Sequence, residues 1–190
     1  MEGKREKSKI LSSILTVTLV LSLALLAADA PSASANKIIL GRQTKNLDIQ
    51  LSPPERLFHP DEDGCFYPGS PKITKDLEVI NVGDVPFRIC MFNATFYGDT
   101  YLAKGLQIEI VELGTGKGEP PHLLYNGTLN GLSEGIEVNG KKAVPQGKSV
   151  TLQITVWMPP TAGNEYQGLS LKADIAITVR FPPAHDGGNN

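Results

Sequence analysis

The residues best suited to chemistry lie in the run His59-Pro60-Asp61-Glu62-Asp63-Gly64, which gathers carboxylates and one imidazole. Carboxylate oxygens are the ligands that calcium prefers, but the run lacks the ligand spacing of an EF-hand loop. Acidic residues between a proline and a glycine are also typical of a solvated turn. A turn is therefore the simpler interpretation, with cation binding as the alternative, and we predict no metal site.

Catalytic motifs are missing elsewhere in the sequence. His122 and His185 belong to no HExxH pair, and the chain has neither a Gly-x-Ser-x-Gly elbow nor a glycine-rich phosphate loop. Its 18 basic and 20 acidic residues nearly balance, and no basic stripe is present for a nucleic acid. We predict no catalytic residue, no cofactor and no nucleic-acid partner, and therefore a protein that is not an enzyme.

The N-terminus has the pattern of a secretory signal peptide. Basic residues precede an uncharged stretch at 10–28, and Ala33-Ser34-Ala35 follows it. This pattern predicts cleavage between Ala35 and Asn36, which removes residues 1–35 and leaves a secreted domain with no membrane contact. A retained membrane helix is the alternative, because the stretch approaches the roughly 20 residues that span a bilayer. Its several serines and threonines weigh against a retained helix.

The two cysteines of the chain, Cys65 and Cys90, both lie in the exported part. An oxidising compartment favours their pairing, so one disulfide is the expectation. Closing the loop between them would stabilise the fold by about 3 kcal/mol in the chain-entropy model. Two buried free thiols are the alternative, because sequence does not give the separation of the Cα atoms.

Two glycosylation sequons occur, at Asn93-Ala94-Thr95 and Asn126-Gly127-Thr128. Their use depends on the host, and an ordinary turn or strand-end asparagine is the alternative at each position. Asn93 and Asn126 are therefore glycosylation candidates.

Apolar and polar residues alternate along several stretches of the chain, which is typical of strands with one buried face. No amphipathic helix is available to cover such strands, so they must pack as two sheets. We predict an all-β fold, a single β-sandwich of immunoglobulin-like or jelly-roll-like type at 46–181, with a flexible tail at 182–190. The predicted core-facing residues include Leu47, Ile49, Leu51, Leu106, Ile108, Ile110, Val150, Leu152, Ile154, Val156, Met158, Leu169, Leu171, Ala173, Ile175, Ile177, Val179 and Phe181.

The stretch 68–89 reads "PGSPKITKDLEVINVGDVPFRI". Leu77 and Val79 alternate with acidic residues, Asn81-Val82-Gly83-Asp84 forms a turn, and an extended segment follows. This order predicts a hairpin. The glycine-rich region 115–133 lacks a clear period, and we expect a short helix there.

The loop "MPPTAGNEYQG" at 158–168 joins two predicted strands but is too long for a tight hairpin. We expect it to cross between sheets or to arch over the end of the sandwich. Two glycines, Gly163 and Gly168, are candidates for positive φ. Tyr166 can bury its ring, and Asn164 and Gln167 can bond the backbone of the loop.

Taken in order, "LDIQLS", "YPGSPKITKDLEVINVGDVPFRI", "WMPPTAGNEYQG" and "LKADIAITVRF" make the chain resemble the TasA/CalY (camelysin) family of exported β-sandwich proteins. The likeness covers about residues 46–181. The signature loop Gly163-Asn164-Glu165-Tyr166-Gln167-Gly168 is its most specific part. The short segment before "LDIQLS" and the cysteine pair depart from the family pattern.

The resemblance implies a structural role, because members similar to TasA form extracellular fibres of biofilms and archaeal relatives form bundling pili. In these assemblies an N-terminal strand of one subunit completes the sheet of the next. Here that strand would come from residues 36–45, whose Ile38, Ile39 and Leu40 are costly to leave in water. Docking of this segment into its own sheet, which would give a monomer, is the alternative, because both arrangements satisfy the same backbone bonds. Other copies of the chain, and other matrix or cell-surface components, would be its partners.

Two other functions remain open. A monomeric cell-surface binding module is the first alternative, with an aromatic platform from Tyr67, Tyr97, Tyr101 and Trp157. A camelysin-type metalloprotease is the more distant one, because the sequence has no recognised zinc motif.

Overall fold

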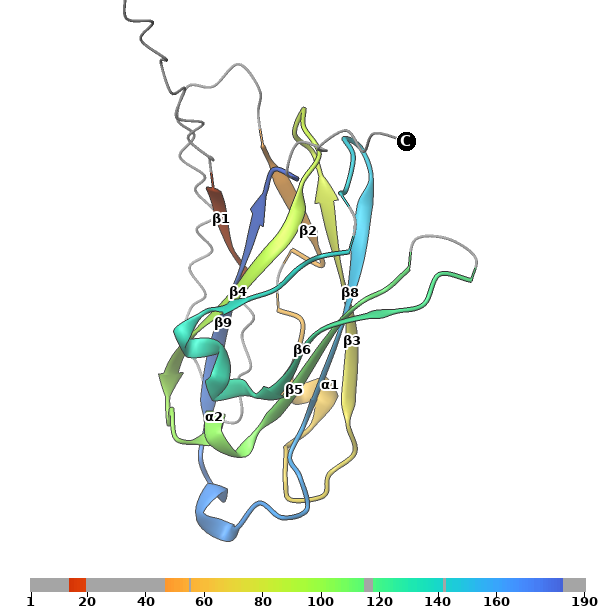
Figure 1. Cartoon of the computed structure of the whole chain (residues 1–190). Helices are drawn as coiled ribbons and strands as arrows, with labels where there is room; N and C mark the ends of the chain where they lie inside the picture. The colour runs from red at the N-terminus through yellow and green to blue at the C-terminus, as the bar shows by residue number, and fades with distance from the viewer. Residues whose placement is uncertain (1–13, 20–46, 55, 115–117, 142, 183–190) are drawn as a thin grey trace, which may run out of the picture.

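The structure, a computed structural model, describes residues 14–19, 47–54, 56–114, 118–141 and 143–182. Most of the regular structure in these ranges is β-strand in antiparallel sheets, so the prediction of an all-β fold is confirmed (Figure 1). The predicted cleavage point between Ala35 and Asn36, the segment 36–45 with Ile38, Ile39 and Leu40, and residues 183–190 of the predicted tail lie outside the described residues.

In the described ranges nine strands form two sheets, and every strand pair there is antiparallel. The four-stranded sheet has, in spatial order, β1 (Ile14–Leu19), β9 (Leu171–Arg180), β4 (Arg88–Gly98) and β7 (Ile136–Glu137). The five-stranded sheet has β2 (Ile49–Ser52), β3 (Ile73–Asn81), β8 (Ser149–Trp157), β5 (Gln107–Glu112) and β6 (His122–Thr128). The helical pieces are α1 (Pro60–Asp63), α2 (Leu102–Gly105) and the 3-10 turns η1 (Leu129–Glu134) and η2 (Asn164–Tyr166).

Alternation in the sequence explains which side chains reach the core. In β8 the residues of one parity, from Val150 to Val156, are at most 3% exposed, and in β9 those from Leu171 to Val179 are at most 2% exposed. Both sets belong to one hydrophobic cluster that also includes residues of β3, β4 and β5. The two sheets therefore share a single core, and strand register is fixed by which parity is apolar.

The predicted hairpin within 68–89 is wrong, because β3 and β4 belong to different sheets. Between these strands the chain crosses from one sheet to the other, with alternate residues exposed and the side chains of Val85 and Phe87 buried in the core. Asn81 holds this crossing: its side-chain amide donates to the carbonyl oxygens of Val85 and Val144, both at 2.8 Å. Gly83 N–H donates to Asn81 Oδ1 at 3.0 Å. Turn residues in the sequence are equally compatible with a hairpin and with a connection between two sheets.

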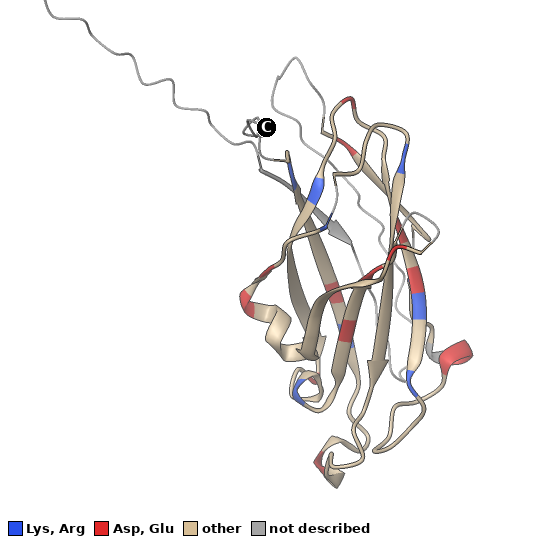
Figure 2. Ribbon diagram, turned by 45° about the vertical axis from the view of Figure 1, so that its right-hand side comes forward, with Lys and Arg blue, Asp and Glu red and all other residues tan. Residues whose placement is uncertain are grey.

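The helical turns are short and lie in the connections between strands. A short helix was expected within 115–133, and η1 begins there at Leu129, with the Thr128 hydroxyl accepting from Gly131 N–H at 3.1 Å. The acidic run from Pro60 to Asp63 forms α1, which the sequence interpretation took as a turn. Charged residues of both signs are interspersed over the strands and loops (Figure 2).

Candidate functional site

The candidate site is the side of β9 that faces β1. On its other side β9 pairs with β4 along its full length, from Leu171 opposite Gly98 to Arg180 opposite Arg88. On the candidate side, β1 pairs with the last six residues of β9, from Ile14 opposite Arg180 to Leu19 opposite Ile175 (Figure 1). A strand from the far N-terminus therefore completes the four-stranded sheet.

β1 comes from the stretch 10–28, which the sequence assigns to the leader. If residues 1–35 were removed as the sequence predicts, β9 would be the outermost strand on this side of the described sheet. The edge of such a strand presents unpaired N–H and C=O groups and readily accepts another strand. The core-facing side chains of β9 at this edge are buried and must stay shielded from water. They are Ile175, Ile177 and Val179.

The sequence interpretation missed β1 as a strand. The stretch that contains β1 was interpreted as part of the signal peptide, although Thr16-Val17-Thr18 is rich in the β-branched residues that favour strands. No helix in the described residues is both long enough and apolar enough to span a bilayer.

The predicted disulfide between Cys65 and Cys90 is absent, and both cysteines are free. Cys65 is exposed in the loop before β3 of the five-stranded sheet. Cys90 is half-buried in the four-stranded sheet, at the bulge of β4 between Ile89 and Met91, and its thiol donates to the carbonyl oxygen of Thr178 at 3.4 Å. The free-thiol alternative thus describes the structure, except that Cys65 is not buried.

We expect the two thiols to react at different rates. Desolvation raises the pKa of the Cys90 thiol, with a smaller increase from Glu137 and an opposing decrease from Arg180. At pH 8 Cys90 therefore has less thiolate than an ordinary cysteine, and part of its surface is covered. Ellman's reagent added to unreduced native protein should modify Cys65 within seconds to minutes and Cys90 far more slowly.

The control for this prediction is Cys65→Ser, which should remove the fast phase alone. In unreduced protein unfolded with guanidinium chloride, two thiols per chain should titrate. A count of zero there would show that the sulfurs are oxidised and would contradict the free-thiol structure.

The signature loop crosses from β8 to β9 and therefore between sheets, as predicted. The ring of Tyr166 stacks on Tyr101 with 5.2 Å between centroids, and it lies over Gly105, where an added Cβ would be 2.8 Å from the ring. Desolvation and the neighbouring Tyr101 raise the pKa of the Tyr166 hydroxyl. The loop is thus a packed corner docked on α2.

The predicted roles of the other loop residues are only partly correct. Gly168 has a φ of +71°, as expected, whereas Gly163 has a φ of −82° and needs no special conformation. Asn164 and Gln167 bond each other through their side chains at 3.0 Å instead of bonding the loop backbone. No ligand-binding arrangement follows from these contacts.

Lysines lie over three of the four rings in the aromatic platform of the binding-module alternative. Tyr67, Tyr97 and Tyr101 are each about half exposed or more. However, a lysine ammonium lies 4.1 to 5.3 Å from the ring centroid in the three cation–π pairs Lys72–Trp157, Lys104–Tyr101 and Lys172–Tyr97. Stacked sugars would compete with these lysines, which weakens the case for a carbohydrate platform.

The remaining candidates have structural contacts. Asn93 donates to the Ser133 carbonyl oxygen at 3.3 Å, and Asn126, on the edge strand β6, donates to Glu109 Oε2 at 2.9 Å. Glycosylation at these two asparagines stays a prediction. Asp63 accepts from His59 N–H at 2.8 Å and pairs with Lys75 at 2.7 Å. Within the described ranges, no group of three or more His, Cys, Asp or Glu side chains could hold a metal ion.

No protein-family model matches the chain, and no curated protein matches it.

Proposed function

We propose that this protein is a secreted structural subunit that polymerises by strand addition into extracellular fibres or pili. The observation that carries the proposal is the pairing of β1 with β9, because a strand from the predicted leader occupies the edge that polymerisation would use. After cleavage at Ala35 that edge would be open, and a strand from a neighbouring subunit would restore its hydrogen bonds.

The donor strand would be the segment 36–45 of the next subunit. Its Ile38, Ile39 and Leu40 are three consecutive large aliphatic residues, and burying them is favourable at about 25 cal/mol per Å² of apolar surface. Insertion into a neighbour is a head-to-tail contact, which does not close on itself and therefore grows a filament.

The proposal includes the fold of the mature chain, which we take to be a single β-sandwich. Two antiparallel sheets around one apolar cluster support a single β-sandwich in the mature chain. The likeness of the signature loop and its flanking strands to the TasA/CalY family supports the fibre role, because fibres and bundling pili are what that resemblance implies. The family's metalloprotease activity is not part of the proposal.

The test compares the mature chain 36–190 with a variant carrying Ile38→Asp, Ile39→Asp and Leu40→Asp. We expect the mature chain to form filaments by negative-stain electron microscopy and to sediment as large species. The triple variant should stay monomeric, because three carboxylates cannot be buried in the neighbour's core. Lys37→Gln is the matched control and should still polymerise.

Binding in trans provides the second measurement. A fluorescent peptide of residues 36–45 should bind the monomeric triple variant with an anisotropy increase, and a peptide with the same three aspartates should not. A mature chain that stays monomeric at high concentration, together with no peptide binding, would overturn the proposal and favour the monomeric binding module.

A further inference from the structure

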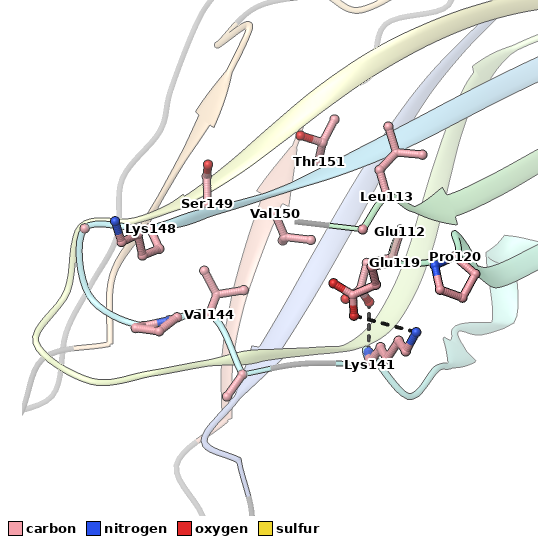
Figure 3. A pocket seen from close by; sticks show the side chains of 14 residues that line it. Glu112, Leu113, Glu119, Pro120, Lys141, Val144, Lys148, Ser149, Val150 and Thr151 are labelled. Atoms are coloured by element: carbon pink, nitrogen blue, oxygen red, sulfur yellow. Dashed lines mark hydrogen bonds and ion pairs between the residues drawn. The ribbon is translucent and has the colours of Figure 1, made fainter. Parts of the chain in front are cut away.

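A cavity of about 460 Å³ lies where β5 ends and β8 begins (Figure 3). Its walls come from the end of β5, the start of β8, the loop 143–148 and the residues before β6. Cavities of a few hundred Å³ hold small organic ligands. The cavity is distinct from the β9 edge, so its role is independent of polymerisation.

The unusual wall residue is Glu112. It continues the core-facing parity of Ile108 and Ile110 in β5, it is opposite Leu152 of β8, and its exposed fraction is 7%. A buried carboxylate is costly unless hydrogen bonds or an opposite charge compensate it. The alternation of β5 predicts an apolar side chain at position 112, but the residue there is an acid that needs hydrogen-bond donors or an opposite charge.

The described residues offer the Glu112 carboxylate few hydrogen-bond donors. Its one hydrogen bond to described residues comes from Lys141 N–H, which donates to Oε2 at 2.9 Å. The ammonium group of Lys141 pairs with Glu119 instead, at 3.7 Å (Figure 3). A carboxylate accepts about four hydrogen bonds, so Glu112 retains acceptor capacity in a cavity that it lines.

The other walls define the shape of a ligand. Leu113, Val144 and Val150 offer apolar surface beside the carboxylate. Exposed Lys148 also lines the cavity and would repel a second positive charge. A monocation with a short apolar body fits these features better than a polyamine does.

We propose that this cavity binds the ammonium group of a small primary amine, with Glu112 as its counter-ion. The ammonium donates to the free acceptor positions of the carboxylate, and the apolar body packs on Val144 and Val150. A charge-assisted hydrogen bond of this kind gives the site its preference for an amine over an alcohol of the same size.

The test is ligand-observed saturation-transfer difference NMR with n-butylammonium chloride, which works for both monomers and filaments. We expect saturable binding with a dissociation constant in about the millimolar range, as suits a ligand of so few atoms. The neutral analogue n-butanol should bind at least about tenfold more weakly, because it lacks the charge.

Variants distinguish specific binding in the cavity from nonspecific adsorption to the protein surface. Glu112→Gln should weaken n-butylammonium binding at least about tenfold, through loss of the charge-assisted hydrogen bond. Glu109→Gln is the matched control, because Glu109 lies in the same strand, bonded to Asn126 on the outer face, and it should bind as the wild type does.

A second variant keeps the test decisive if Glu112→Gln fails to fold. Ala143→Leu fills part of the cavity from a half-buried wall position and leaves the carboxylate in place, and it should also abolish saturable binding. Equal binding by wild type and either folded cavity variant, or no saturable signal from the wild type, would overturn the proposal.

Discussion

Asn81→Asp is expected to lower the free energy of unfolding by about 4 kcal/mol, a large share of the roughly 5–15 kcal/mol of a typical domain. Asn81 is fully buried, and its amide donates to the Val85 and Val144 carbonyl oxygens at 2.8 Å each. Aspartate places an acceptor where two donors are needed, so the Val85 carbonyl oxygen loses this bond and the Val144 carbonyl oxygen keeps only its bond from Phe87 N–H at 3.1 Å. The crossing between the two sheets would lose its main side-chain anchor.

The measurement is urea unfolding followed by the fluorescence of Trp157. Asn81→Ala should fall between wild type and Asn81→Asp, because it removes the donors without adding a buried charge. The control is Asn139→Asp, at an exposed position, which should change stability by no more than about 0.5 kcal/mol. Equal stability of the two aspartate variants would contradict the assigned role of Asn81.

Gly98→Ala is expected to destabilise the fold by about 3 kcal/mol. Gly98 ends β4 with a φ of +83°, a conformation that side chains other than glycine rarely adopt. An added Cβ would also come within 2.9 Å of the Ser170 carbonyl oxygen, which belongs to the backbone and cannot rotate away. The variant therefore combines backbone strain with a steric clash at the start of β9.

Gly64→Ala separates these two contributions. Gly64 has a φ of +76°, but no other atom lies within 4 Å of its added Cβ. It should cost only about 1 kcal/mol, the strain alone. Urea unfolding of both variants should therefore differ by about 2 kcal/mol, and equal losses would show that the contact with Ser170 relaxes freely.

Strand positions were predictable from the sequence because alternation is a local property. The buried parity of β5, β8 and β9 follows directly from apolar residues two positions apart. Which strands pair is not local: Asn81 is held by Val144, 63 residues further along the chain. The hairpin prediction failed for this reason, since turn residues specify a reversal but not the sheet that the chain enters next.

The candidate sites, too, could be predicted only in part from the sequence. The β9 strand was predicted from its alternation, but its pairing with β1 joins segments more than 150 residues apart in the sequence. Glu112 was not singled out, although the parity of Ile108 and Ile110 leads to it, because an acidic residue at a strand end is usually exposed. The state of the cysteines was not predictable, because the sequence does not give the distance between the loop that holds Cys65 and the strand β4 that holds Cys90.

In any polymer that uses the β9 edge paired here with β1, each subunit would accept a strand from one neighbour and donate its N-terminal segment to the other. Every junction would have the same polarity, so the two tips of a filament would be chemically different. One tip would carry a vacant β9 edge and the other a spare N-terminal segment. A short peptide copying that segment would then stop elongation at one tip only, while the opposite tip continued to grow.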